Sequence, residues 1–218
     1  MKKQHIYLFL IFISTSIYTN GYSQLAGNTS VLKLKLEKLF DDDQKIRVIL
    51  DSLINLHGYE SSTVQSYIKE TMMEIDSVNT VEVTNILNTY GWLGTDKVGM
   101  KGNAALFVII QHGSLKTQET YLPMLRTSVK QGKSSPINLG MLEDRIALSQ
   151  HKKQVYGTQL WTKDDGSLFI APVITPDKLD KRRKKIGLEP IADYAKAHGF
   201  EWNLDTYKKE IVKYEKML

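Results

Sequence analysis

The first 23 residues constrain this chain most, because they have the order of a secretory signal peptide. Lys2 and Lys3 precede an apolar run from Ile6 to Ile17, and small and polar residues end the segment at Ser23. The run is shorter than the roughly 18 to 20 apolar residues that a permanent membrane anchor needs. We therefore expect cleavage near Ser23 and export of the mature chain, without a transmembrane span, as a bacterial periplasmic or secreted protein.

The remaining residues predict one domain without a nucleic-acid partner. Cleavage after residue 23 removes two lysines and no acidic residue, so the formal charge falls from +5 to +3. That excess is too small for the basic surface of a nucleic-acid-binding protein. The absence of cysteine excludes disulfides, thiolate catalysis and a cysteine-ligated zinc site. We expect a flexible N-terminus at residues 24–30, followed by a single mostly helical domain at 31–218.

Helical periodicity covers most of this domain. Apolar residues recur every three or four positions from Val31 to His57, with one gap at Asp43, which is typical of a long amphipathic helix. The apolar run Ala104–Ile110 could be a buried helix or a buried strand, and we favour the helix. Further helices are predicted over residues 63–75, 81–90, 117–131, 135–150, 175–187, 190–198 and 205–217.

Cap and turn residues predict where several helices begin and end. Gly91 opens a loop through residue 94, and we expect Gly113 and Gly187 to end helices. Ser135 and Thr175 are each followed by proline, which is the signal for an N-cap and a first helical position.

Two short segments break the helical pattern. Residues 156–162 and 168–173 are aromatic and β-branched, and they flank a turn-forming Asp-Asp-Gly-Ser sequence at 164–167. This pattern is typical of a β-hairpin. The predicted fold class is therefore mainly α, a single helical domain with a small β-hairpin after the helix that carries Asp144 and Arg145.

Two carboxylates are predicted on buried helix faces, where a lone charge is costly. Asp43 fills the gap in the first apolar stripe, and Arg47 lies one turn further on with Gln44 beside it, so an ion pair fits. Asp144 has no polar residue three or four positions away, and Arg145 points about 100° away from it. Structural ties between helices are our first interpretation of these residues, and a functional site is the second.

His112 ends the most hydrophobic segment of the chain. A lone histidine is usually a satisfied core or cap residue, and a general base is the second interpretation. His57, His151 and His198 show no ligand spacing with it, so neither a metal site nor a cofactor is predicted.

Residues 154–159 are dense in polar side chains. In an extended chain, Gln154, Tyr156 and Thr158 would share one face, opposite Gln159. Such a face suits recognition of a polar, uncharged ligand, or it satisfies buried backbone groups, and we keep both interpretations. The basic run at 181–185 reads as a solvated helix face, with Arg183 as the one side chain turned inward.

These positions together resemble a bacterial family known as domain of unknown function 6624. The resemblance spans residues 40–188, with Leu93 where the family pattern prefers proline. It is carried by Asp43-Gln44-x-x-Arg47, Gly91-Trp92, Gln111-His112, Asp144-Arg145, Gln154-x-Tyr156-Gly157-Thr158-Gln159 and Arg183-x-x-Ile186-Gly187-Leu188. The resemblance implies no established activity, but it does imply that the scattered polar residues form one constellation between the helices and the hairpin.

Two functions follow from such a constellation. The first is an exported domain that binds a polar ligand or an envelope partner. Its binding candidates are Gln44, Arg47, Gln111, Gln154, Thr158, Gln159 and Arg183. The alternative is a hydrolase or transferase in which His112 is the general base, Asp144 orients it, Arg145 stabilises developing negative charge and Tyr156 positions the substrate.

Overall fold

The structure is a computed structural model that describes the backbone of residues 4–163 and 165–218. Side chains are described from residue 29 onward, except those at 164 and 217. The side chains of the predicted signal peptide, its cleavage site and most of segment 24–30 lie outside the described residues, so these assignments stay predictions. The fold class is confirmed, because the chain is mainly helical with one small antiparallel hairpin.

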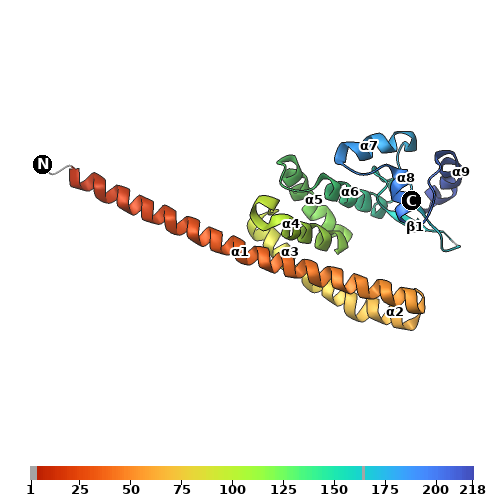
Figure 1. Ribbon diagram of the computed structural model, residues 1–218, viewed down its shortest axis with the longest axis horizontal. Helices are drawn as coiled ribbons and strands as arrows, with labels where there is room; N and C mark the ends of the chain where they lie inside the picture. Colours follow the sequence, from red (N-terminus) through yellow and green to blue (C-terminus); the bar gives the residue numbers. More distant parts are fainter. Residues whose placement is uncertain (1–3, 164) are drawn as a thin grey trace.

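The first helices form a long antiparallel arm, in which α1 runs beside the segment that follows it (Figure 1). Residues 62–90 are one nearly continuous helical run, so the predicted break between residues 75 and 81 is wrong. No glycine or proline lies there to interrupt the backbone hydrogen bonds. The elements are α1 (Gln4–His57), α2 (Ser62–Ser66), a π-helical segment (Tyr67–Met72) and α3 (Met73–Tyr90).

The apolar run at 104–110 lies in a helix, α4 (Thr95–His112), so the helix is confirmed over the strand. This helix packs against α1 and buries Leu106 and Ile110 completely. Gly113 caps its C-terminus as predicted, and Gly99 kinks its first turns with φ +70°. The close fit to α1 brings the end of α4, with His112, beside the middle of α1.

Two further helices complete the first core, α5 (Leu115–Lys130) and α6 (Pro136–Ser149). The predicted cap of α6 is confirmed, because the Ser135 hydroxyl accepts a hydrogen bond from the Asn138 N–H. These two helices pack on each other, and α6 also contacts α4. The residue pair Asp144-Arg145 is thereby carried to the boundary between the helical core and the C-terminal part.

The C-terminal part has its own buried cluster around a hairpin. The strands are shorter than the predicted segments, and they pair antiparallel with Trp161 opposite Phe169. Residues 155–159 do not form a strand, since the chain bends at 155–156 and Gly157 has φ +67°, so the shared face that an extended chain would give does not form. The elements are β1 (Leu160–Thr162), β2 (Leu168–Ile170), a 3-10 turn (Pro176–Lys178), α7 (Leu179–Ile186), α8 (Ile191–Ala197), α9 (Leu204–Tyr214) and a final 3-10 turn (Glu215–Met217).

Two cap predictions fall in this part of the chain. Thr175 occupies the N-cap position before Pro176 as predicted, but it adopts a left-handed conformation with φ +40° and its side chain makes no capping hydrogen bond. Gly187 ends α7 in the left-handed conformation that glycine adopts without steric cost.

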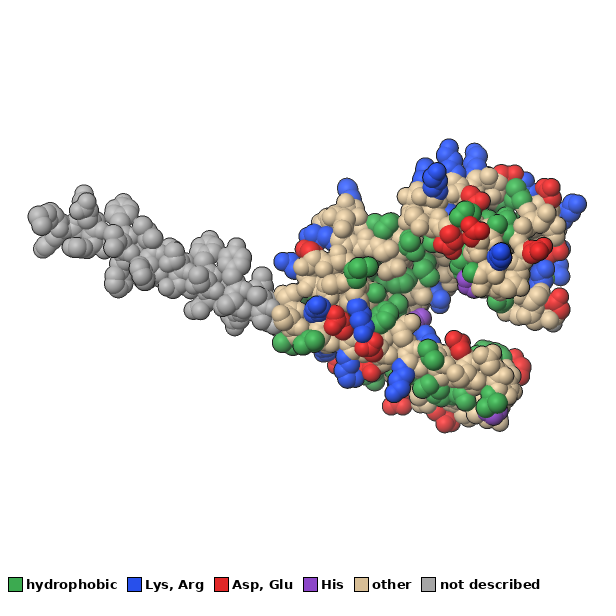
Figure 2. All heavy atoms as spheres, viewed as in Figure 1, with side chains coloured by type: hydrophobic (Ala, Val, Ile, Leu, Met, Phe, Trp, Pro, Cys, Tyr) green, Lys and Arg blue, Asp and Glu red, His purple; other side chains and the backbone are tan. Residues whose placement is uncertain are grey.

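Two arms diverge from the central helices, one made of α1 with α2 and α3, the other of α7 to α9 (Figure 1). Figure 2 shows the surface hollowed between these arms, with histidine side chains close to where the arms meet. Among the described residues, none of the helices combines the length and the apolar character required to cross a bilayer.

Candidate functional site

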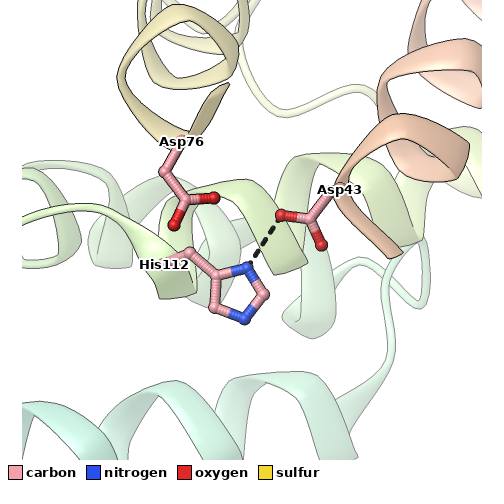
Figure 3. A group of neighbouring side chains, drawn as sticks. All are labelled: Asp43, Asp76 and His112. Atoms are coloured by element: carbon pink, nitrogen blue, oxygen red, sulfur yellow. Dashed lines mark hydrogen bonds and ion pairs between the residues drawn. The ribbon is translucent and has the colours of Figure 1, made fainter. Parts of the chain in front are cut away.

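Four charged or titratable side chains from three helices meet one another, and we call them the Asp43 cluster. Asp43 and Arg47 come from α1, Asp76 from α3, and His112 from the end of α4. Arg47 Nη2 lies 3.1 Å from Asp43 Oδ1 and 2.7 Å from Asp76 Oδ1. His112 Nδ1 lies 2.9 Å from the same Asp43 oxygen (Figure 3). The predicted ion pair of Asp43 with Arg47 is confirmed.

Asp43 is the buried centre of this cluster, with none of its surface exposed. Burial, the largest single influence, raises the pKa of its carboxyl group, whereas the hydrogen bond from His112, and the charge of that ring when it is protonated, lower it. The charge of Arg47 and a 2.8 Å hydrogen bond from Gln44 Nε2 act in the same direction, so the pKa is lowered overall. The cluster therefore holds Asp43 as a carboxylate.

His112 Nδ1 has two contacts that need opposite tautomers. It lies 2.9 Å from the Asp43 oxygen, to which only a protonated Nδ1 can donate. It also lies 3.1 Å from Arg47 Nε, which can donate only to an unprotonated Nδ1. The shorter contact is to a buried carboxylate, and a charge-assisted bond of this kind favours the proton on Nδ1. The lone pair of the neutral ring then lies on Nε2.

The other ring nitrogen of His112, Nε2, points away from both carboxylates (Figure 3). It makes no hydrogen bond to the described residues, and the side chain is 17% exposed. His112 and Asp76 also line a pocket of about 360 Å³. Its polar lining is completed by hydroxyl groups, those of Ser77, Thr80, Ser114 and Thr117. A neutral His112 thus offers a basic nitrogen beside a partly open pocket that contains hydroxyl groups.

The same residues resemble a metal-ligand set, since atoms of Asp43, Asp76 and His112 lie within 4.8 Å of one another. The guanidinium of Arg47, however, already bridges both carboxylates and reaches Nδ1 of the histidine. A metal ion would have to displace that cation. The donor set therefore fits an arginine-neutralised cluster better than a metal centre, and no chemical step below passes through a metal.

Asp144 occupies a different environment, which we call the Asp144 loop, made of this residue and residues 154–159. Its carboxylate accepts backbone N–H groups of Val155 at 2.6 Å, of Tyr156 at 3.0 Å and of Thr158 at 3.1 Å. The Thr158 hydroxyl adds a fourth bond at 3.0 Å. Burial raises the pKa of Asp144, although these hydrogen bonds oppose the change. Asp144 therefore organises a loop, and the prediction that it orients His112 is wrong, since Asp43 takes that place.

The amide of Gln154 is satisfied inside the same loop. Its nitrogen donates to the carbonyls of Gln159 and Ala171, and its oxygen accepts the Gln159 N–H. The side chain of Gln159 in turn donates to the Thr158 hydroxyl. These side chains form hydrogen bonds within the protein itself. They therefore satisfy buried backbone groups, which was one of the two interpretations of this segment, and are not available to recognise a ligand.

The Asp144 loop is also held by Arg183 from α7 and by the packing of the Tyr156 ring on α6. Arg183 is turned inward as predicted and fully buried, and it donates to the carbonyls of Tyr156, Gly157 and Glu189. The Tyr156 ring lies over Gly140 of α6, where a Cβ atom would approach it to 3.1 Å. Burial, followed by the charges of Glu143 and Asp144, raises the pKa of Tyr156.

The predicted constellation thus divides in two. Arg47 and His112 belong to the Asp43 cluster, to which Gln44 is hydrogen-bonded. Gln154, Tyr156, Thr158 and Gln159 belong to the Asp144 loop, to which Arg183 is hydrogen-bonded. The two remaining candidates each keep a buried atom without a partner among the described residues, Nε of Arg145 and Oε1 of Gln111.

Asp76 is the functional candidate that the sequence interpretation missed. It lies in the stretch that was predicted to separate two helices. In one continuous helix, Asp76 precedes buried Asn79 by three positions and buried Val83 by seven, which places it on the buried stripe. The absence of any helix breaker between residues 75 and 81 was the signal that could have revealed it.

The model of one protein family, described as a family of unknown function (DUF6624), matches residues 32–205. The chain belongs to this family. The matched range includes both the Asp43 cluster and the Asp144 loop. No curated protein and no solved structure matches the chain. Membership of DUF6624 brings no activity with it, so function has to be argued from the site.

Proposed function

We propose that this protein is an exported hydrolase or transferase in which His112 acts as the general base. One observation carries the proposal: Nδ1 of His112 is held by the buried Asp43 carboxylate, while Nε2 has no partner among the described residues. Export rests on the N-terminal sequence alone.

The chemistry requires one proton to move through Nε2. In hydrolysis, Nε2 takes a proton from water as the water oxygen forms a bond to the electrophilic substrate atom. The imidazolium then gives that proton to the leaving group as its bond breaks. Asp43 stabilises the imidazolium through the Nδ1–H bond, and the C-terminal end of α4 favours the same positive charge. Arg47 and Asp76 hold Asp43 in place.

Non-catalytic binding of a polar ligand is a second candidate, favoured by the hydroxyl groups in the pocket beside His112. Ser77, Thr80, Ser114 and Thr117 can each donate and accept hydrogen bonds. A ligand that binds there without being consumed would support this candidate over the enzyme.

The tautomer of His112 tests the base directly. Long-range ¹⁵N–¹H correlation spectra of the labelled mature protein at neutral pH should show a protonated Nδ1 and an unprotonated Nε2. Asp43→Asn should shift the population toward the Nε2–H form, because Arg47 Nε then becomes the stronger partner of Nδ1. A wild-type ring with the proton on Nε2 has no free lone pair there and would contradict the proposal.

Activity is tested with chromogenic esters, phosphoesters and glycosides. Turnover by the wild type should fall by about 10² to 10⁴ in His112→Gln, which is the range for loss of a general base. His198→Gln is the matched control, since that histidine is exposed and bonds only the Tyr194 carbonyl. Equal loss in both variants would point to a general effect of histidine removal.

A further inference from the structure

One arginine has no hydrogen-bond or ion-pair partner among the described residues. The protein has five arginines, all in the described part. Arg47 and Arg126 bind carboxylates, and Arg182 and Arg183 donate to backbone carbonyls. Arg145 makes no hydrogen bond or ion pair with any described residue, and its Nε atom is buried.

This guanidinium is not a free surface group. The Arg145 residue is half-buried on α6, next to fully buried Asp144, whose carboxylate is turned to its own loop. Burial lowers the pKa of Arg145, and the charge of Arg47 lowers it further. A half-buried cation that is repelled by a neighbouring cation costs free energy unless something else compensates its charge.

Helix packing and electrostatics both bear on where Arg145 lies. Arg47 is the residue whose charge acts on Arg145, and Arg47 Nε is 3.1 Å from His112 Nδ1. In addition, α6 packs on α4, the helix that ends at His112. The packing of α6 on α4 and the influence of the Arg47 charge both point to a position near the Asp43 cluster. The two carboxylates of that cluster are bonded to Arg47, and neither of them forms an ion pair or a hydrogen bond with Arg145.

We propose that Arg145 binds an oxyanion group of the substrate, a carboxylate or a phosphate, beside His112. This inference rests on the proposed function and names the substrate class of the same site. A guanidinium presents parallel N–H donors that match two oxygens of such a group, and half-burial strengthens the bond by excluding water. The anion would give the guanidinium of Arg145 the partner that none of the described residues provides.

Inorganic phosphate and acetate serve as probes, titrated at constant ionic strength into ¹⁵N-labelled mature protein. The Nε–H resonance of Arg145, assigned by its loss in Arg145→Met, should shift saturably with a dissociation constant in the millimolar range. Binding measured by calorimetry should weaken at least tenfold in Arg145→Met. It should weaken less in Arg145→Lys, which keeps the charge but lacks the planar donors. Arg126→Met is the matched control, because that side chain is 54% exposed and pairs with Glu143.

Melting temperature adds a second measurement. Without an added anion, Arg145→Met should melt at the wild-type temperature or above, and phosphate should raise the melting temperature of the wild type only. A response to phosphate alone identifies a phosphate group in the substrate, and a response to acetate alone identifies a carboxylate. Absence of saturable binding, equal binding by Arg145→Met, or a large drop in its melting temperature would each overturn the proposal.

Failure of this inference is separable from failure of the proposed function. His112→Gln should keep the phosphate affinity of the wild type within about twofold, because Arg145 binds the anion independently of the base. If His112 carries its proton on Nε2 while Arg145 still binds phosphate, the general base is wrong and the anion site stands. The reverse result leaves the general base and removes the anion site.

Discussion

Asp43 and Asp144 are both fully buried carboxylates on helices, and the protein satisfies them in opposite ways. Asp144 accepts three backbone N–H groups and one hydroxyl, all from a single loop. Asp43 is bonded by the side chains of Arg47, His112 and Gln44. Backbone amides cannot titrate or move apart from the chain, so the first arrangement holds the fold. The second contains groups that can exchange a proton, so it can also do chemistry.

The largest loss of stability is expected when the Asp144 carboxylate, which accepts the hydrogen bonds of its loop, is removed. Asp144→Ala leaves three backbone N–H groups buried without partners, at about 1 to 3 kcal/mol each, so we expect a loss of about 3 to 5 kcal/mol in unfolding free energy. Asp144→Asn keeps one acceptor oxygen and should lose less. Urea unfolding at neutral pH measures both variants. A loss below about 1 kcal/mol for the alanine variant would contradict a structural role.

Arg183 should come next, because it ties the same loop to α7 through backbone carbonyls. Arg183→Met leaves those acceptors unpaired and should cost about 2 to 4 kcal/mol. Lys184→Ala, in the same basic run but exposed, is the control and should change stability by less than about 0.5 kcal/mol. Similar losses from both substitutions would mean that the inward position of Arg183 is unimportant.

Asp43→Asn should cost less than either change, about 2 kcal/mol, since Asp76 still pairs with Arg47. Its larger consequence should be in activity, where it should approach the loss of His112→Gln because the ring is no longer held as a base. Urea unfolding and turnover of the same sample separate the two effects. If Asp43→Asn loses stability but keeps full turnover, the role of Asp43 is purely structural, like that of Asp144.

The smallest expected effect is a pH dependence of the stability that Asp43 contributes. The pKa of Asp43 is lowered from an unfolded value of 3.8, so its contribution to stability is fully present well above that pH. The contribution is lost as the pH falls through the folded pKa, because the carboxylate must take up a proton. The stability gap between wild type and Asp43→Asn should therefore narrow from about pH 6 to about pH 3. A gap that stays constant or widens in acid would contradict the lowered pKa.

Local signals in the sequence predicted individual features of the site, but they did not predict which residues from different helices come into contact. The Asp43–Arg47 pair follows from helical spacing, and the inward turn of Arg183 was also anticipated. Asp76 was missed because the helix that carries it was divided in two. The partner of His112 was assigned to Asp144 because nothing local says which of two buried carboxylates reaches a histidine on another helix.

The sequence alone therefore determined the helical class, the hairpin, most helix ends and the buried position of both carboxylates. These features depend on periodicity and capping within a few residues. Only the tertiary structure decided that Asp43 meets His112, that Asp144 holds a loop and that Arg145 is left without a partner. Those contacts join residues up to 69 positions apart, and they depend on how α1, α4 and α6 pack, which no spacing along one helix specifies.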